Sequence, residues 1–541
     1  MRLCGKEEGT RVMKKAEFYP GAVLSMGVVL AAVSSLSATD LSAAAPAKAD
    51  WPTYLGPNGS GSAAPVTDAM VEKFAEAKLV WQSDVQIPNG MAGDGRNPGR
   101  DGVCFISGGY ASPVLSDGKV YVQYYVPSGE PSKSMVGKVG EKFADKFRVE
   151  ADDVVHCFDA ATGKTAWRTV FPKTSMNMQA FTKGGPSLTC CIANGRVYAH
   201  VNGGLVLALD AKNGEKLWEF KTDRFAFQEK IRAVARQKQE IALYNRDYKT
   251  SPTVVDGVVV FNDHRKHKTC EPGTGDNWVC HYEPPSNLVA LDGATGKELW
   301  RLPIASNGGQ PVPWLCGSKW FVIVPCEDKQ VRCLEPRTGK ELWAVQTADG
   351  LTPVVDGEFM VCGGATEPKK RFHVGYRITE AGAEKLWELT SHGRPGLAWP
   401  AAANGHMYVE SNPRGKLICV ELATGTVVGE APAAKEKHFG YFPRVMGSRV
   451  VCGGADTDQL HLYTSDPKDF RLLDDAPIPN AWGYEMPMMP ALADGRIYFR
   501  THDRLVCVDL RKDAKDGTPL VPADLAQKPY TTLQLGESSN P

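Results

Sequence analysis

The apolar positions of this chain fall in short alternating runs that are separated by tight polar turns and that recur regularly. The clearest unit is a run ending in Trp, which returns as Val155–Trp167, Leu207–Trp218, Leu288–Trp300 and Val331–Trp343. In each copy an Asp or Glu opens the turn and a Gly follows four residues later. Because the acidic side chain can bond the turn backbone and Gly accepts positive φ, each unit predicts a β-hairpin.

Weaker copies of this hairpin continue the series toward the C-terminus. One ends at Trp387 with one residue inserted, and another ends at Gly429 without its Trp. Leu460–Leu473 keeps little of the pattern, and Leu505–Asp509 lacks a second strand. The chain therefore carries four clear hairpins and four weak ones, eight in all.

A second kind of run alternates with the hairpins. It opens with Pro and contains a turn, as in Ser112–Gly118, Ser251–Gly257 and Thr352–Gly357, and looser copies stand near residues 193–195, 313–317, 400–405, 443–447 and 490–495. Each precedes a β-rich stretch, so every unit holds four strands. Four strands repeated every 40 to 50 residues or so are typical of a β-propeller. The sequence predicts an all-β, eight-bladed propeller, with an open β-solenoid as the alternative.

The two ends of the repeat region each hold an incomplete unit. Leu505–Asp509 has no Trp strand after it, whereas Lys78–Gln82 is a Trp strand with no hairpin before it. We expect the N-terminal strand to pair with the last hairpin strand and to close the ring. Closure would remove the exposed sheet edges of an open array.

The runs Ala208–Trp218 and Ala290–Trp300 resemble the tryptophan-docking repeat of quinoprotein-type eight-bladed propellers, over roughly residues 51–510. That family includes pyrroloquinoline quinone (PQQ) dehydrogenases and non-catalytic outer-membrane assembly propellers. Trp51–Gly61 also resembles the opening of exported quinoprotein-like propellers. The resemblance implies that the repeat tryptophans pack between adjacent blades, namely Trp81, Trp167, Trp218, Trp300, Trp343 and Trp387.

The N-terminal region has the pattern of an export signal. Lys14 and Lys15 precede the apolar run Gly21–Val33, and small residues follow it. Because a membrane helix needs about 20 apolar residues, this run predicts a signal peptide within residues 1–45 rather than an anchor. Translation could start at Met1 or at Met13. We expect a periplasmic or secreted protein.

The remaining organisation follows from the repeats. The propeller is expected over 51–520, with a helical insertion at about 224–245, a loop insertion at about 262–287 and a tail at 521–541. The apolar side chains Ile231, Val234, Ile241 and Leu243 are expected to dock the helix on the propeller. Lys and Arg number 62 and Asp and Glu also number 62, which excludes the basic excess of most nucleic-acid-binding proteins.

Most of the fourteen cysteines occupy small apolar positions of the repeat. Cys157, Cys333, Cys419 and Cys507 stand where other copies have Ala, which favours buried thiols. Cys190 and Cys191 are adjacent, like the pair that lies against the cofactor in quinoprotein dehydrogenases. A cofactor contact, a vicinal disulfide and two buried thiols all remain possible, and the last is favoured.

The loop insertion contains Cys270 and Cys280, for which a disulfide is predicted. The nearby side chains His264, His267 and His281 leave a metal site or neither arrangement as alternatives.

The loops that lead into the inner strands provide the candidate ligand site. They combine aromatic and polar residues: Tyr110, Lys183, Asp247, Tyr248, Gln310, Trp399, Tyr441, Tyr484 and Glu485. Such a set suits a ligand pocket at the mouth of the channel, where rings would stack on a sugar or a peptide side chain. The alternative is that these side chains plug the channel.

No catalytic residue can be assigned from the sequence. It has no Cys-x-x-Cys-His haem motif, no Gly-x-Ser-x-Gly motif and no phosphate-binding glycine loop. Among the mouth loops Asp247, Asp349 and Glu485 stand on three different blades, without the calcium-binding pattern of quinoprotein dehydrogenases. We expect a monomeric, non-catalytic binding or scaffolding module for a protein or carbohydrate, with no cofactor. The alternatives are a dehydrogenase using PQQ with calcium and a carbohydrate-binding accessory protein.

Overall fold

The computed structural model describes 22 segments of the chain, all within one compact unit spanning 42–541. They are residues 50–88, 108–109, 111–133, 148–176, 179–180, 183–184, 188–201, 203–240, 243–244, 250–263, 268–272, 278–282, 286–304, 309–347, 352–367, 370–391, 400–411, 416–432, 441–454, 459–478, 489–501 and 503–525. The proposed signal peptide lies outside them.

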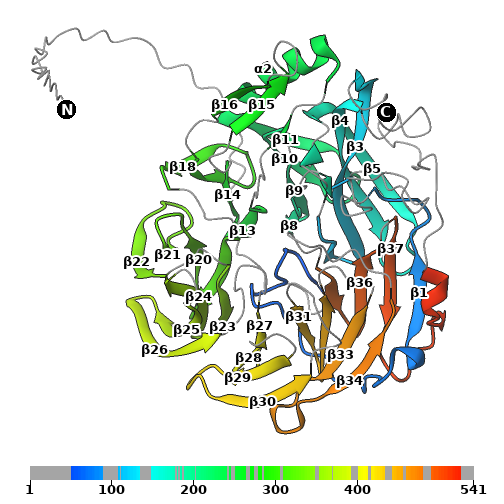
Figure 1. The fold of residues 1–541 in the computed structure, drawn as a ribbon, viewed down its shortest axis with the longest axis vertical. Coiled ribbons are helices and arrows are strands. Elements are labelled where there is room, and N and C mark those ends of the chain that lie inside the picture. The colour runs from blue at the N-terminus through cyan, green and yellow to red at the C-terminus, as the bar shows by residue number, and fades with distance from the viewer. Residues whose placement is uncertain are drawn as a thin grey trace, which may run out of the picture. The chain divides into compact units, whose positions relative to one another are not determined.

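The described strands form eight antiparallel blades arranged in a ring, which confirms the predicted fold (Figure 1). Blade 1 comprises β2 (Val114–Ser116), β3 (Lys119–Pro131), β4 (Arg148–Asp159) and β5 (Thr165–Met176). Blade 2 comprises β8 (Cys191–Ala193), β9 (Arg196–His200), β10 (Leu205–Asp210) and β11 (Lys216–Lys221). Blade 3 comprises β13 (Thr253–Val255), β14 (Val258–Asn262), β17 (Leu288–Asp292) and β18 (Glu298–Leu302). Blade 4 comprises β19 (Val312–Cys316), β20 (Lys319–Pro325), β21 (Gln330–Leu334) and β22 (Glu341–Gln346).

The second half of the ring repeats this plan. Blade 5 comprises β23 (Val354–Asp356), β24 (Phe359–Glu367), β25 (Lys370–Thr379) and β26 (Gly382–Ser391). Blade 6 comprises β27 (Ala401–Ala403), β28 (His406–Ser411), β29 (Lys416–Glu421) and β30 (Val427–Pro432). Blade 7 comprises β31 (Tyr441–Met446), β32 (Arg449–Gly454), β33 (Leu460–Thr464) and β34 (Leu472–Ala476). Blade 8 comprises β35 (Ala491–Ala493), β36 (Arg496–Arg500), β37 (Leu505–Asp509), β1 (Lys78–Gln82) and β38 (Thr518–Pro519).

The other described elements are small. β6 (Gln179–Ala180) pairs with β7 (Lys183–Gly184), and β12 (Leu243–Tyr244), β15 (Lys268–Pro272) and β16 (Trp278–Tyr282) form a three-stranded sheet. Short 3-10 helices are η1 (Phe74–Glu76), η3 (Pro467–Asp469) and η4 (Pro522–Leu525).

The helix of the insertion is α2 (Asp223–Lys238), which starts one residue before the predicted range and ends seven residues before its predicted end. The expectation that Leu243 belongs to this helix was wrong, because Leu243 lies in β12, and Ile241 lies outside the described residues. It buries one face, made by Arg224, Gln228, Ile231, Arg232 and Ala235. Arg236 reaches back to blade 1, where its Nε lies 2.7 Å from Oε1 of the buried Glu150. The helix therefore docks on the propeller through a mixed apolar and charged contact.

The N-terminal strand closes the ring, as the sequence predicted. β1 pairs antiparallel with β37, with Leu79 opposite Val508 and Gln82 opposite Val506. On its other side β1 pairs with β38, so the last blade gains a fifth strand. Segments from the two ends of the propeller thus share one sheet.

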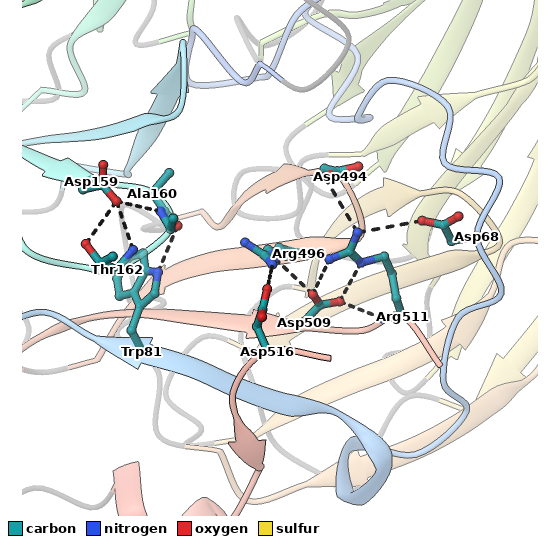
Figure 2. A network of polar contacts seen from close by, with 11 residues as sticks. Asp68, Trp81, Asp159, Ala160, Thr162, Asp494, Arg496, Asp509, Arg511 and Asp516 are labelled. Atoms are coloured by element: carbon teal, nitrogen blue, oxygen red, sulfur yellow. Dashed lines mark hydrogen bonds and ion pairs between the residues drawn. The ribbon is translucent and has the colours of Figure 1, made fainter. Parts of the chain in front are cut away.

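A polar network at the closing blade reinforces this pairing (Figure 2). Asp509, almost fully buried, accepts hydrogen bonds from Arg496 Nε at 3.0 Å and from Arg511 Nη2 at 2.6 Å. Arg511 also lies within 3.9 Å of Asp68, which precedes β1. Burial alone would raise the pKa of Asp509, but the hydrogen bonds from Arg511 and Arg496 outweigh it, and its pKa lies below the ordinary value.

Six tryptophans each join one blade to the next, across six of the eight seams. Each indole Nε1 donates to a carbonyl in the hairpin turn of the following blade, at 2.6–3.0 Å: Trp81 to Ala160, Trp167 to Ala211, Trp218 to Gly293, Trp300 to Pro336, Trp343 to Thr379 and Trp387 to Leu422. Five of the rings also lie against the turn glycine of that blade, where a Cβ would come within 2.4–2.8 Å. The turn glycine therefore leaves room for the indole between the blades and also accepts the positive φ of the turn.

Three of the four repeated cysteines, Cys157, Cys333 and Cys507, lie opposite these tryptophans, and Cys419 lies opposite Gly429. Cys157 is the cross-strand partner of both Tyr121 and Trp167, and Cys507 is that of Tyr498 and Trp81. A small side chain between two aromatic rings lets both pack on one face of the sheet. Burial raises the pKa of Cys157 to about 12, so the thiol is an unreactive packing group.

Blade 6 lacks the docking Trp, and a ring from the neighbouring blade fills its place. Gly429 occupies the Trp position, and a Cβ there would lie 2.6 Å from Cβ of Phe470. Phe470 belongs to the turn of blade 7 and packs against Tyr408 of blade 6 with ring centroids 5.7 Å apart. This seam therefore keeps an aromatic contact. Its ring comes from the following blade, whereas each docking Trp comes from the preceding blade.

We expect Trp300→Ala to lower the free energy of unfolding by about 3–5 kcal/mol, because it removes a buried ring and its seam hydrogen bond. Leu299→Ala is the matched control, since that neighbouring side chain is 37% exposed, and it should cost under about 1 kcal/mol. Denaturant-induced unfolding measures both. Equal losses for the two variants would contradict the docking role.

Asp509→Asn should destabilise the protein by about 3 kcal/mol, because it leaves two arginines facing a neutral group. Asp516→Asn is the control, since its side chain is 75% exposed, and it should change the stability by less than about 0.5 kcal/mol. Because the folded pKa of Asp509 is lowered, its contribution is present above pH 4 or so and is lost as the pH falls through the folded pKa. A variant as stable as the parent at neutral pH would refute this account.

Candidate functional site

The central channel is crossed by the chain's own residues 51–63, which we call the channel segment. At its start Trp51 exchanges backbone hydrogen bonds with Leu115 of blade 1, and Ile192 of blade 2 donates to Pro52 O at 2.9 Å. At its end Ala402 of blade 6 donates to Ser60 O at 2.8 Å, and Val445 of blade 7 pairs with Ser62. Figure 1 shows this segment in dark blue across the middle of the ring.

The channel segment starts at one face of the ring. Ala160 N donates to Gly118 O, so the two hairpin turns of blade 1 share this face, which we call the turn face. Asp50, just before the segment, accepts hydrogen bonds from Ser116 Oγ and Asp117 N at the same turn. The inner strands begin at the opposite face, the mouth face, and the predicted ligand residues precede these strand starts in the sequence. From the turn face the segment runs into the channel as far as Val312, which begins β19.

The channel segment is packed tightly against the inner strands. Trp51 is fully buried, and Tyr54 and Leu55 belong to the core of blades 4, 5 and 7. Gly59 has φ of +69° and lies so near blade 4 that a Cβ would come 2.3 Å from Cγ1 of Val312. Gly61 lies similarly close to blade 6, because a Cβ there would come 3.1 Å from Cβ of Ala401. The glycines of the sequence Gly-Ser-Gly permit this close approach.

On the mouth side, buried hydroxyls link the starts of neighbouring inner strands. Ser112 N donates to Thr189 Oγ1 at 2.9 Å, and Thr189 N donates to Ser251 Oγ at 3.0 Å. Met489 N donates to Ser112 Oγ at 2.8 Å, which joins blade 8 to blade 1. In the sequence Ser112 and Ser251 are the residues before the opening Pro. The Ser of the repeated Ser-Pro pair thus supplies a hydroxyl that links two blades, and the Pro after it precedes the inner strand.

One of the nine predicted mouth residues has a described side chain. Gln310 is 4% exposed, its backbone N donates to Thr352 Oγ1 at 2.9 Å, and its Oε1 is buried without a hydrogen-bond partner. Lys183 lies in β7 and Tyr441 begins β31, and only their backbone positions are described. The other six, Tyr110, Asp247, Tyr248, Trp399, Tyr484 and Glu485, lie outside the described residues.

Cys190 and Cys191 are both free and buried. Neighbouring residues of a strand face opposite sides of the sheet. Accordingly, Cys190 packs in the core between blades 1 and 2, and Cys191 packs in the core between blades 2 and 3. Burial raises the pKa of Cys190 to about 12 and raises that of Cys191 well above its ordinary value. Two thiols in separate cores do not form a surface on which a quinone could stack, so the pair does not fit the cofactor.

Cys270 and Cys280 are directly opposite each other in the β15–β16 pair. Cα atoms of opposed residues in antiparallel strands lie about 4.5–5.5 Å apart, which is within the range that a disulfide spans. The predicted disulfide therefore remains a prediction that the backbone register permits. Of the nearby histidines, His264 and His267 lie outside the described residues.

A buried charge lies beside the channel segment, and no sequence pattern predicted it. Arg444, on the inner strand of blade 7, is fully buried, and a Cβ on Gly61 would come 3.2 Å from its Nη1. Burial lowers the pKa of Arg444 to about 10, and Tyr54 of the channel segment acts on it electrostatically.

Within the described ranges no three His, Cys, Asp or Glu side chains gather as metal ligands would. None of the helices described there is long and apolar enough to span a membrane.

A family model described as outer membrane protein assembly factor BamB, with PQQ-type repeats, matches residues 67–310, 262–366 and 327–520. The chain belongs to this family. Among solved structures it is similar to quinohemoprotein alcohol dehydrogenase ADHIIG from Pseudomonas putida HK5, at 15% identity and a TM-score of 0.50, covering 88% of this chain and 82% of that one. BamB from Moraxella catarrhalis matches at 14% identity and a TM-score of 0.42, covering 66% and 88%.

A curated relative is the serine/threonine-protein kinase AfsK of Streptomyces coelicolor, which is 28% identical over 170 residues. The match covers 29% of this chain and 18% of that protein. The family match and the likeness to the dehydrogenase structure agree with the propeller fold, and the family model and that structure are named for an assembly factor and a dehydrogenase respectively. The family therefore fixes the fold and leaves the activity to be argued from the residues.

Gly59→Ala should destabilise the protein by about 1–3 kcal/mol more than Gly195→Ala. Both glycines have positive φ, but a Cβ at Gly195 meets nothing within 4 Å, whereas one at Gly59 overlaps Val312. The comparison separates the effect of packing from the effect of backbone strain. Thermal unfolding of the two variants measures it, and equal midpoints would show that the channel segment does not pack as described.

Proposed function

We propose that this protein is an exported, non-catalytic propeller that acts as a binding or scaffolding module. The proposal rests on the finding that the chain's own residues occupy the channel. The channel is crossed by residues 51–63, and the adjacent Cys190 and Cys191, the strongest sequence link to quinone chemistry, are packing residues. These groups stabilise the ring, and ligand contacts are left to the mouth loops and the outer strands.

The outer strands offer apolar surface to a partner. Leu217 of blade 2 and Leu299 of the neighbouring blade 3 are 44% and 37% exposed. Both are the residue just before the docking Trp, so the two leucines occupy equivalent positions on adjacent blades. Exposed apolar side chains at adjacent positions are typical of protein contact surfaces. This supports a partner protein more than a carbohydrate, which would favour stacking at the mouth.

Titration with pyrroloquinoline quinone and calcium tests the proposal against the dehydrogenase alternative. We expect no quinone absorbance to be retained on gel filtration and no dye reduction with alcohols or sugars. A general base and a metal that polarises the quinone carbonyl would both be needed for that reaction. Calorimetry on the same samples measures binding directly.

The outcome that would overturn the proposal is micromolar or tighter quinone binding that is lost in Glu485→Gln or Asp247→Asn. Asp494→Asn is the matched control, because this carboxylate lies on a turn of blade 8 and is 67% exposed. Loss of binding in the mouth variants but not in the control would place the cofactor at the mouth and make the protein an enzyme.

A further inference from the structure

Five side chains form one continuous chain of hydrogen bonds where blade 8 meets blade 1, a contact that we call the closing seam. Arg168 Nε donates to the hydroxyl of Tyr124 at 3.3 Å, and this hydroxyl lies 3.0 Å from Nδ1 of His156. Nε2 of His156 lies 3.0 Å from Oγ1 of Thr165, which donates to Asp84 Oδ1 at 2.9 Å. Tyr124 and His156 have no exposed surface, whereas Asp84 is exposed. The chain therefore runs from the core to the surface.

This hydrogen-bond chain lies on the side of blade 1 that faces the closing strand. His156 stacks on Phe158 with ring centroids 4.1 Å apart, and Phe158 belongs to the same core as Trp81 of β1. Asp84 comes two residues after β1, and its carboxylate accepts hydrogen bonds from both the backbone N and Oγ1 of Thr165, the first residue of β5. Asp84 therefore ties the end of the closing strand to blade 1, near the docking contact of Trp81.

The two ends of the chain fix which atom donates in each hydrogen bond. An ionised carboxylate only accepts, so the hydroxyl of Thr165 donates to Asp84. The same oxygen must then accept from His156, which assigns the imidazole proton to Nε2. Nδ1 is therefore unprotonated and accepts from the hydroxyl of Tyr124, whose oxygen accepts from Arg168. The chain is complete only while His156 is neutral.

A second proton on His156 would break this chain. Nδ1–H would point at the hydroxyl of Tyr124, whose own hydrogen would then lose its acceptor. The ring would also become a cation directly opposite Arg168 in the β4–β5 pair. Burial and the charge of Arg168 lower the pKa of His156 well below its ordinary value. The other charged groups of this seam are Arg500 of blade 8, which acts on Tyr124, and Asp84, which lies beyond the Thr165 hydroxyl.

We propose that His156 makes the ring closure sensitive to acid: when His156 takes up a second proton, the closing seam opens at Trp81 and Asp84. Opening lets water reach the face of blade 1 that carries His156, so the imidazolium becomes hydrated. Because the open form binds this proton more tightly, the seam has its full stability above about pH 6.5, the ordinary histidine value, and loses stability as the pH falls below it. This conformational change goes beyond the scaffolding proposal and does not depend on it.

Exchange of the tryptophan indole N–H groups at pH 5, 6 and 7 tests the proposal in the full chain. The indole of Trp81 donates across the closing seam, and the indole of Trp300 donates across the seam between blades 3 and 4. The two rings are 7% and 8% exposed, and residues 288–346 around the second seam contain no histidine. The protection of Trp81 relative to a free indole should fall by up to about tenfold for each pH unit below 6.5 or so, and that of Trp300 should not.

Two histidine variants identify the group that responds. His156→Gln cannot take up the proton, so the protection of Trp81 should no longer depend on pH. His373→Gln is the matched control, because His373 is similarly buried but lies on β25 of blade 5, and it should keep the response of Trp81. If His156→Gln does not fold, the comparison of the two indoles in the parent protein still decides. The proposal is overturned by equal pH responses of Trp81 and Trp300, by a Trp81 protection that is constant from pH 7 to 5, or by an unchanged response in His156→Gln.

Discussion

The indole of the repeat tryptophan, crossing from one blade to the turn of the next, is the contact on which the ring depends. Each blade is a separate sheet, so side chains, turns and the channel segment join neighbouring blades instead of strand pairing. The indole supplies both apolar surface and a directed N–H, which fixes the blade spacing as well as holding it. Where the Trp is missing, at Gly429, a Phe from the opposite direction takes over. In these seams an aromatic ring fills the space between two blades, and either blade of the pair can supply that ring.

Closing the ring turns these local seams into one structure. β1 places Trp81 in the last seam and also supplies the strand that blade 8 lacks. The same N-terminal stretch first crosses the channel as residues 51–63 and touches blades 1, 2, 6 and 7. The segment therefore links blades that are distant around the ring.

The sequence predicted the repeat, the blade number and the closing strand, because these depend on hairpin chemistry and on counting unpaired strands. It could not predict Phe470, since the space that this ring fills is created by a glycine on another blade. Trp51–Gly61 was visible as a motif, but its path across the channel depends on contacts with strands hundreds of residues away. Arg444 carried no sequence signal, because its burial beside Gly61 shows only in three dimensions. Of the mouth residues, only Gln310 could be compared with its predicted role.

The central claim is that the N-terminal segments are integral parts of the ring rather than additions to it. Native-state hydrogen exchange of the backbone amides tests this most directly, because it gives an opening free energy for each segment. The account predicts that the amides of β1 exchange with the same free energy as those of β37, and that the hydrogen-bonded amides Gly61 and Ala63 of the channel segment are protected to a similar degree. Exchange of 51–63 and β1 at the low free energy of a fraying end, while β37 stays protected, would contradict it.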